Sequence, residues 1–158
     1  MTQVLIAVGS NLGDRRKNLD RALSLFGKIP DIRILKTSSV RETEPVGGPP
    51  QGKYLNAVWL AETGLAPEKL LDELLAIEKK LGRERREPDA PRTLDLDILF
   101  FGDQIIRRPG LVVPHSRLEQ RVFVLEPLAE LVPEWVHPRL KKTVRAILEE
   151  VLEGHSKP

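Results

Sequence analysis

The sequence contains no cysteine, few aromatic residues and no long apolar run. The absence of cysteine excludes disulfide bonds, thiolate metal sites and a cysteine nucleophile. No apolar stretch approaches the roughly 20 residues that a membrane-spanning helix needs. The first residues, MTQVLIAVGSN, have no basic segment before their short apolar run. We therefore expect a strand rather than a signal peptide at this end, and a cytoplasmic protein.

The charge balance is nearly even, with 25 basic and 23 acidic residues and a net charge of +2. So small an excess does not favour a nucleic-acid partner. Hydrophobic residues at 41% and charged residues at 30% are ordinary for a soluble globular protein. A chain of 158 residues can form a proper core. We predict a single domain over residues 1–158 that is monomeric, binds small molecules and has no membrane partner.

The hydrophobic pattern alternates between strand and helix periods. Strands are predicted at residues 3–8, 32–40, 54–62 and 92–101, with a short returning strand at 104–106. Helices are predicted at residues 14–27, 67–81, part of 120–131, and from 143 to a frayed tail at 154–158. This order predicts an α+β fold of the ferredoxin-like sandwich type, in which helices pack on an antiparallel sheet, with a C-terminal helical extension.

Two carboxylates stand at the start of the last long strand. Alternation places Leu94, Leu96, Ile98 and Phe100 on one face and Asp95, Asp97, Leu99 and Phe101 on the other. Because side chains two residues apart point the same way, both aspartates project together. Two like charges this close favour a cation between them, and oxygen ligands alone suit magnesium. The alternative is a polar strand end that faces water.

Two irregular segments border the predicted strands. Residues 41–53 include three glycines and three prolines, which indicates a binding loop rather than a simple hairpin. Residues 83–92 hold four arginines, directly before the two aspartates. Guanidinium groups bind phosphate bidentately, so this neighbourhood favours a polyphosphate ligand. Because Glu84, Glu87 and Asp89 offset much of the charge, a solvated loop is the alternative.

Further candidates for ligand contacts lie elsewhere in the chain. Tyr54, Asn56 and Phe123 are candidates for a flat, partly aromatic pocket, although aromatic residues usually pack in the core. A heterocycle with donors and acceptors would satisfy the amide of Asn56, and so would a neighbouring backbone. His115 is followed by Arg117 and Arg121, which form a second cationic cluster.

The turn after the first strand, Gly9-Ser10-Asn11-Leu12-Gly13, contains glycine between a strand and a helix. It matches neither the G-x-x-x-x-G-K-[ST] nor the G-x-G-x-x-G phosphate-binding pattern. We interpret it as a tight turn.

Four motifs, in order along residues 4–128, resemble those of one enzyme family. They are VGSNLGD, TEPVGGPPQGKYLNA, APRTLDLDILFFG and VPHSRLEQRVFVLEPL, and RTLDLD with the downstream VPH is the most specific part. With them the chain resembles the 6-hydroxymethyl-7,8-dihydropterin pyrophosphokinases of the folate pathway. The resemblance implies that ATP donates its β,γ-diphosphate to the pterin hydroxymethyl oxygen and that AMP is released.

The resemblance also implies roles for individual residues. Asp95 and Asp97 would hold two magnesium ions and, with Arg83 and Arg92, form the catalytic set. The implied ATP contacts are Glu78, Arg83, Arg85, Arg92, Ile98, His115 and Arg121. The implied pterin contacts are Thr43, Pro45, Val46, Tyr54, Asn56 and Phe123. Segments 41–53 and 82–92 would close over the substrates. The chain departs from the family pattern at Asp89, Gly110 and Ser116.

Two other functions stay open at this point. A non-catalytic ferredoxin-like module could bind phosphate or RNA through the arginine segment while the aspartates are solvated. Against RNA, the predicted strands show no run of exposed aromatic residues on which bases could stack. Another magnesium-dependent phosphotransferase would differ only in its acceptor.

Overall fold

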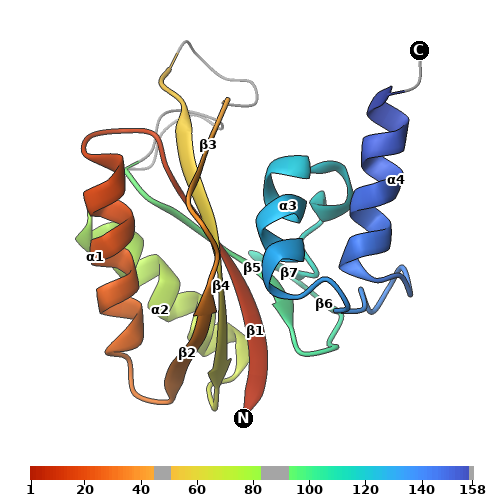
Figure 1. Cartoon of the computed structure of the whole chain (residues 1–158). Coiled ribbons are helices and arrows are strands. Elements are labelled where there is room, and N and C mark those ends of the chain that lie inside the picture. Colours follow the sequence, from red (N-terminus) through yellow and green to blue (C-terminus); the bar gives the residue numbers. More distant parts are fainter. Residues whose placement is uncertain (45–50, 83–92, 157–158) are drawn as a thin grey trace.

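A computed structural model describes residues 1–44, 51–82 and 93–156, and its centre is an antiparallel sheet (Figure 1). The long strands lie in the order β2 (Ile32–Thr37), β4 (Tyr54–Thr63), β1 (Thr2–Ser10) and β5 (Asp95–Phe101). A short strand, β3 (Arg41–Thr43), also pairs with β4 and lies at the start of the segment predicted as loop. The strand and helix order confirms the antiparallel sheet with helices packed on it, and the split βαβ order is ferredoxin-like.

One face of the sheet packs against α1 (Arg15–Gly27) and α2 (Pro67–Lys80). Asp14 caps α1 by accepting a 3.1 Å hydrogen bond from the Lys17 N–H, as the sequence predicted. Pro67 stands in the first turn of α2, where its missing N–H costs nothing. Apolar residues of both helices meet alternate residues of the strands and form the larger core cluster.

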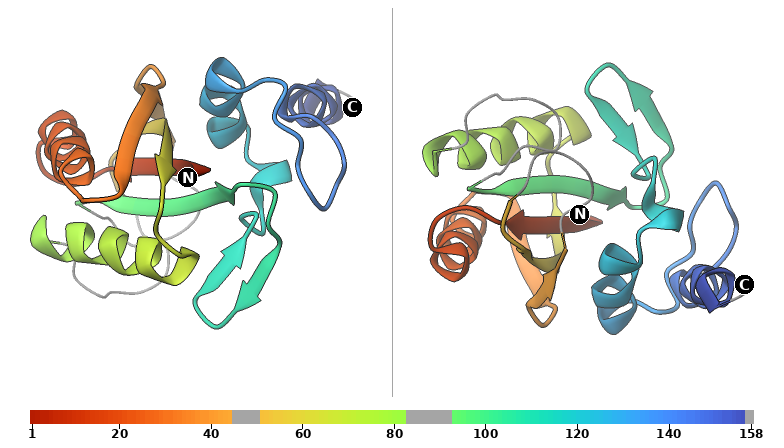
Figure 2. Two further views of the ribbon diagram at one scale, coloured as in Figure 1. Left: turned by 90° about the horizontal axis from the view of Figure 1, so that it is seen from below. Right: turned by 90° about the horizontal axis from the view of Figure 1, so that it is seen from above.

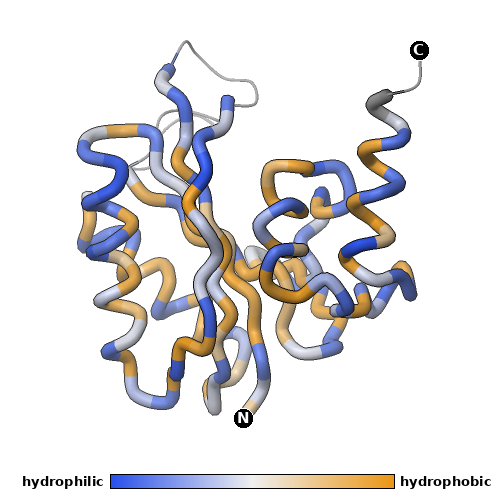
Figure 3. Tube along the Cα trace, in the orientation of Figure 1, coloured by the Kyte–Doolittle hydropathy of each residue, from blue (hydrophilic) through white to orange (hydrophobic). Residues whose placement is uncertain are grey.

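The other face packs against α3 (Val122–Leu131), the short η1 turn (Leu118–Gln120) and α4 (Val144–Ser156). Figures 1 and 2 show these elements on the opposite side of the sheet from α1 and α2. Thr143 caps α4 with a 3.1 Å bond from the Ala146 N–H, as predicted. The helix continues to Ser156, so the predicted frayed tail is wrong for residues 154–156. The two core clusters explain why the apolar colour runs along β1 in Figure 3.

A bulge in β5 changes which residues face which core. The pairing with β1 shifts from Ile6↔Ile98 to Leu5↔Phe100, so Leu99 is an extra residue. Leu99 and Phe100 therefore both join the cluster around α3, whereas Phe101 joins the cluster around α1 and α2. The predicted faces are correct from residue 94 to 99 and wrong for Phe100 and Phe101, because one inserted residue inverts the alternation.

A separate hairpin follows the main sheet. Strand β6 (Ile106–Arg108) pairs with β7 (Leu111–Val113), and Gly110 between them has a φ of +76°. The short strand predicted at residues 104–106 is thus displaced along the chain and does not pair with β5. Within the described residues, no helix combines the length and apolar character needed to cross a membrane.

Candidate active site

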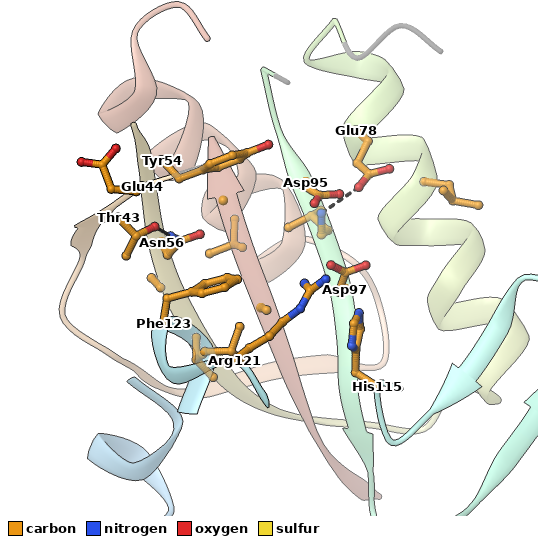
Figure 4. Close-up of a pocket in the computed structure, with 18 of the residues that line it drawn as sticks. Thr43, Glu44, Tyr54, Asn56, Glu78, Asp95, Asp97, His115, Arg121 and Phe123 are labelled. Atoms are coloured by element: carbon orange, nitrogen blue, oxygen red, sulfur yellow. Dashed lines mark hydrogen bonds between the residues drawn. The ribbon is translucent and has the colours of Figure 1, made fainter. Parts of the chain in front are cut away.

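A pocket of about 410 Å³ lies where β1 ends and where β4 and β5 begin. These three strand ends meet because neighbouring strands of the sheet are antiparallel. Residues from α2, the β6–β7 turn and the segment leading into α3 complete the wall. Figure 4 shows the polar side chains that converge on this space. Nine of the predicted site residues line it: Thr43, Tyr54, Asn56, Glu78, Asp95, Asp97, His115, Arg121 and Phe123.

Asp95 and Asp97 lie together in the middle of the pocket, on the same face of β5 (Figure 4). Across the ladder they pair with Gly9 and Ala7 of β1, respectively. Both β1 residues are small and line the pocket, so they leave space beside the carboxylates. A Cβ on Gly9 would lie 2.8 Å from the Asn56 Oδ1 atom, so a larger residue here would push the Asn56 amide aside. Ala7 and Gly9 are not among the site residues predicted from the sequence.

Glu78 holds the start of β5 from the side of α2. Its side chain is buried, and its Oε2 atom accepts a 2.7 Å hydrogen bond from the Leu96 N–H. Leu96 lies between the two aspartates in sequence, and β5 is an edge strand whose outer amides have no strand partner in the described sheet. The Glu78 carboxylate therefore accepts a hydrogen bond from the backbone N–H between Asp95 and Asp97, the two predicted metal ligands.

His115 and Arg121 form the basic side of the pocket. Burial lowers the pKa of His115, and the positive charges of Arg121 and Arg117 lower it further, while Asp95 raises it. The His115 Nδ1 atom accepts a 3.3 Å hydrogen bond from the Arg117 N–H, which places the proton of the neutral ring on Nε2. The site thus offers a neutral Nε2–H donor and a permanent guanidinium charge to an anionic ligand.

The remaining side of the pocket combines two rings with an amide. Tyr54 and Phe123 come from β4 and α3, and Figure 4 shows their rings on either side of the space beside Asn56. The Asn56 Nδ2–H group donates to the Thr43 Oγ1 atom across the β3–β4 ladder, which fixes the orientation of the amide. Arg121 also contacts Phe123, with its Cζ atom 5.7 Å from the ring centroid. A flat heterocycle with polar edges fits this slot.

An apolar wall completes the pocket beside Glu78. Leu71 and Leu75 of α2 line it at helical spacing with Glu78, and Gly110 lies in the same wall. Leu75 is 48% exposed, although it is apolar. Neither leucine was predicted as a site residue, because both lie beside the buried stripe of α2, and Leu71 also packs against the core cluster. An apolar residue such as Leu75 outside that stripe was the available signal.

Some predicted residues are not part of this arrangement. Ile98 lies in the core cluster around α1 and α2 and does not line the pocket. The predicted contacts of Pro45, Val46, Arg83, Arg85 and Arg92, and the departure at Asp89, fall outside the described residues. Their assignment stays a prediction.

The chain matches known proteins over most of its length. The sequence model of the family described as 7,8-dihydro-6-hydroxymethylpterin-pyrophosphokinase (HPPK) matches residues 5–133. The chain is 40% identical over 147 residues to the 2-amino-4-hydroxy-6-hydroxymethyldihydropteridine pyrophosphokinase of Synechocystis, which covers 93% of this chain and 75% of the relative. The protein of the same name in Pseudomonas aeruginosa is 44% identical over 132 residues, which covers 84% of this chain and 82% of the relative.

Solved structures share the same fold. The wild-type HPPK-DHPS of Plasmodium falciparum, crystallised with pterin and p-hydroxybenzoate, superposes with a TM-score of 0.76 at 18% identity. This match covers 96% of the present chain and 42% of that longer chain, and at such low identity it supports the fold alone. The sequence matches show the family as well as the fold: the chain belongs to the 7,8-dihydro-6-hydroxymethylpterin-pyrophosphokinase family.

Proposed function

We propose that this chain transfers the β,γ-diphosphate of ATP to the hydroxyl group of 6-hydroxymethyl-7,8-dihydropterin, with release of AMP, as a step of folate biosynthesis. Membership of the pyrophosphokinase family supports the reaction. The observation that carries it is that one pocket places the carboxylate pair Asp95 and Asp97 beside the slot between Tyr54 and Phe123. An acceptor in the slot would present its side chain to a phosphate chain at the carboxylates.

The donor set of the pocket fits magnesium. Asp95 and Asp97 offer two carboxylates on one strand face, and magnesium usually takes one or two carboxylates together with phosphate oxygens and waters. In the described part of the chain, no group of three or more His, Asp or Glu side chains could enclose a metal by itself. We therefore propose two magnesium ions held by Asp95 and Asp97, and their charge would neutralise the phosphate oxygens during transfer.

The acceptor would lie flat between Tyr54 and Phe123. Aromatic rings on either side stack with a heterocycle whatever its polar pattern, so they supply affinity. Asn56 would then select the heterocycle, because its amide is held in one orientation by Thr43. Gly9 lines the pocket beside this slot, and a side chain there would crowd the Asn56 amide and the Tyr54 ring.

The basic side of the pocket would hold the phosphates. Arg121 offers a guanidinium charge and His115 a neutral Nε2–H donor, and Figure 4 shows both beside Asp97. We propose Arg83, Arg85 and Arg92 as further phosphate contacts, Glu78 as an ATP contact, and Pro45 and Val46 as pterin contacts. Phosphoryl transfer depends mainly on positioning and electrostatic stabilisation, and this set of groups provides both.

Residues from Ala7 to Val124 line the same pocket, which supports the further proposal that residues 1–158 act as one catalytic domain. We also propose that the domain acts as a monomer.

The deciding experiment follows the nucleotide product. The purified chain is incubated with ATP and MgCl₂, with and without 6-hydroxymethyl-7,8-dihydropterin, and the nucleotides are separated by ion-exchange chromatography. We expect AMP only when the pterin is present, in equal amount with the pterin diphosphate. ADP would indicate transfer of the γ-phosphate alone. No turnover by a chain that is folded by circular dichroism would favour the non-catalytic binding module.

A further inference from the structure

The amide of Asn18 joins three segments of the chain near the active site. Asn18 stands in the first turn of α1 and is only 8% exposed. Its Nδ2 atom donates to the Ser10 Oγ atom at 3.2 Å, the Leu12 carbonyl at 3.0 Å and the Thr93 carbonyl at 3.2 Å. Because the two carbonyls can only accept, the NH₂ end of the amide must face them.

The bond to Thr93 lies just before the first residue of β5, beyond the end of its pairing with β1. The ladder between β1 and β5 ends at the pair Gly9↔Asp95. Thr93 is two residues before Asp95, so the chain at this point has no further β1 partner in the described ladder. Asn18 provides the next tether, from α1 to the backbone just before β5. On the other edge of the strand, Glu78 holds the Leu96 N–H. The first residues of β5 are thus fixed from two sides.

We infer that Asn18 is a positioning residue for Asp95: its bond to the Thr93 carbonyl fixes the start of β5 and so the place of the first carboxylate. The inference deepens the proposed function and rests on it. Asn18 does not line the pocket, so it would act through the backbone rather than on a substrate. A displacement of about 1 Å in a reacting group can lower a rate by about a hundredfold, so one lost tether is enough to be measured.

A purely structural role for Asn18 gives a different expectation. In that case its three bonds only satisfy the Ser10 hydroxyl and two carbonyls beside the start of α1, and their loss would lower stability without a specific effect on turnover. Asp14 supplies a matched control, because it caps the same helix through the Lys17 N–H and makes no bond to Thr93. Asp14→Ala should therefore destabilise the start of α1 while the tether to β5 remains.

The test compares Asn18→Ala with Asp14→Ala in the full chain. Urea unfolding measures the stability of both, and steady-state kinetics with ATP, MgCl₂ and the pterin give kcat and KM. We expect Asn18→Ala to lower kcat at least tenfold with the KM for the pterin changed less than about threefold. Asp14→Ala should keep kcat within about twofold. A kcat for Asn18→Ala within twofold of the control would overturn the inference.

Hydrogen exchange provides a second readout that does not depend on turnover. We expect the amides of residues 95–97 to exchange faster in Asn18→Ala than in Asp14→Ala, because only the first variant frees the start of β5. Unchanged exchange would contradict the tether even if kcat falls. If wild-type chain forms no AMP, the proposed reaction fails while the exchange experiment still tests the tether. If Asn18→Ala does not fold, Asn18→Ser is used, because it keeps a donor in the first turn of α1 with a shorter reach.

Discussion

Loss of the Glu130 carboxylate should loosen the contact between α3 and the sheet. Its Oε2 atom accepts a 2.8 Å bond from the Ser39 N–H. Its Oε1 atom accepts bonds from the Ser39 Oγ–H at 2.6 Å and the Arg41 guanidinium at 3.1 Å. These bonds join the last turn of α3 to Ser39, in the connection before β3, and to Arg41, the first residue of β3. Helix α3 also carries Phe123 and β3 carries Thr43, and both residues line the pocket. Glu130→Ala removes all three.

The stability lost in Glu130→Ala depends on how exposed Glu130 and its partners are. A net hydrogen bond contributes roughly 0.5–1.5 kcal/mol, and three would suggest several kcal/mol. The Glu130 side chain is 35% exposed and Arg41 is 36% exposed, so water replaces much of what is lost. We therefore expect Glu130→Ala to lower the free energy of unfolding by only about 1 kcal/mol, or about 2–4 °C in Tm for a domain of this size. Glu130→Gln keeps one acceptor oxygen and should lose less stability than Glu130→Ala.

The effect of Glu130 should depend on pH in a defined direction. Hydrogen bonds from Ser39 lower the pKa of Glu130 below its ordinary value of 4.5, and the charge of Arg41 adds to this. A folded-state pKa below the unfolded value gives stability that is present above pH 4.5 and is lost as the pH falls through the folded pKa. The difference in unfolding free energy between wild type and Glu130→Gln should thus be largest near pH 7 and shrink toward pH 3.

Urea unfolding followed by circular dichroism at pH 7 and pH 3.5 measures this difference. Glu134→Gln is the matched control, because Glu134 forms an exposed ion pair with Arg145 at 2.6 Å and should change stability by less than about 0.5 kcal/mol. If Glu130→Gln lowers the free energy of unfolding no more than the control at pH 7, the Glu130 bonds do not stabilise the fold. A difference between wild type and Glu130→Gln that grows on acidification would contradict the lowered pKa of Glu130.

Three further predictions follow, two about the pocket and one about the buried His137. Asp97→Asn should lower kcat at least about a hundredfold with unchanged urea unfolding, and a loss below tenfold would contradict the metal assignment. Phe123→Leu should raise the Kd for the pterin, measured by its fluorescence, about tenfold, because ring stacking contributes roughly 1–3 kcal/mol; an unchanged Kd would remove Phe123 from the slot. Burial lowers the pKa of His137 below 6.5, so wild-type stability should fall as the pH drops below 6.5. His137→Asn retains an acceptor for the Arg139 and Leu140 N–H groups and should weaken this fall; an equal fall would exclude His137 as its source.

The sequence predicted those site features that follow from strict backbone periods. Asp95 and Asp97 share a face because alternation in a strand is fixed by geometry, and both line the pocket. Phe100 and Phe101 were assigned to the wrong faces, because the bulge at Leu99 leaves no mark in a run of uniformly apolar residues. Hydrophobicity cannot report a change of register when both faces of the strand are buried.

The features of the site that the sequence did not predict depend on contacts between segments far apart in the chain. The Thr43–Asn56 bond needs β3, which lies at the start of a segment whose glycines and prolines indicate a loop. Asn18 reaches Thr93 across 75 positions, and only the arrangement of α1 against β5 brings them together. Ala7 and Gly9 are ordinary small strand residues until the pocket above them is known.

The end of β5 ties the two halves of the molecule together mechanically. Neighbouring side chains of a strand point to opposite faces, so the rings of Phe100 and Phe101 are anchored in opposite cores. The bulge at Leu99 decides which ring enters which core. Neither helical layer can therefore separate from the sheet without pulling a large ring out of its packing on the same strand. We expect the layers to melt in one cooperative transition rather than in two steps. The carboxylates at the other end of that strand would then keep their places until the whole domain unfolds.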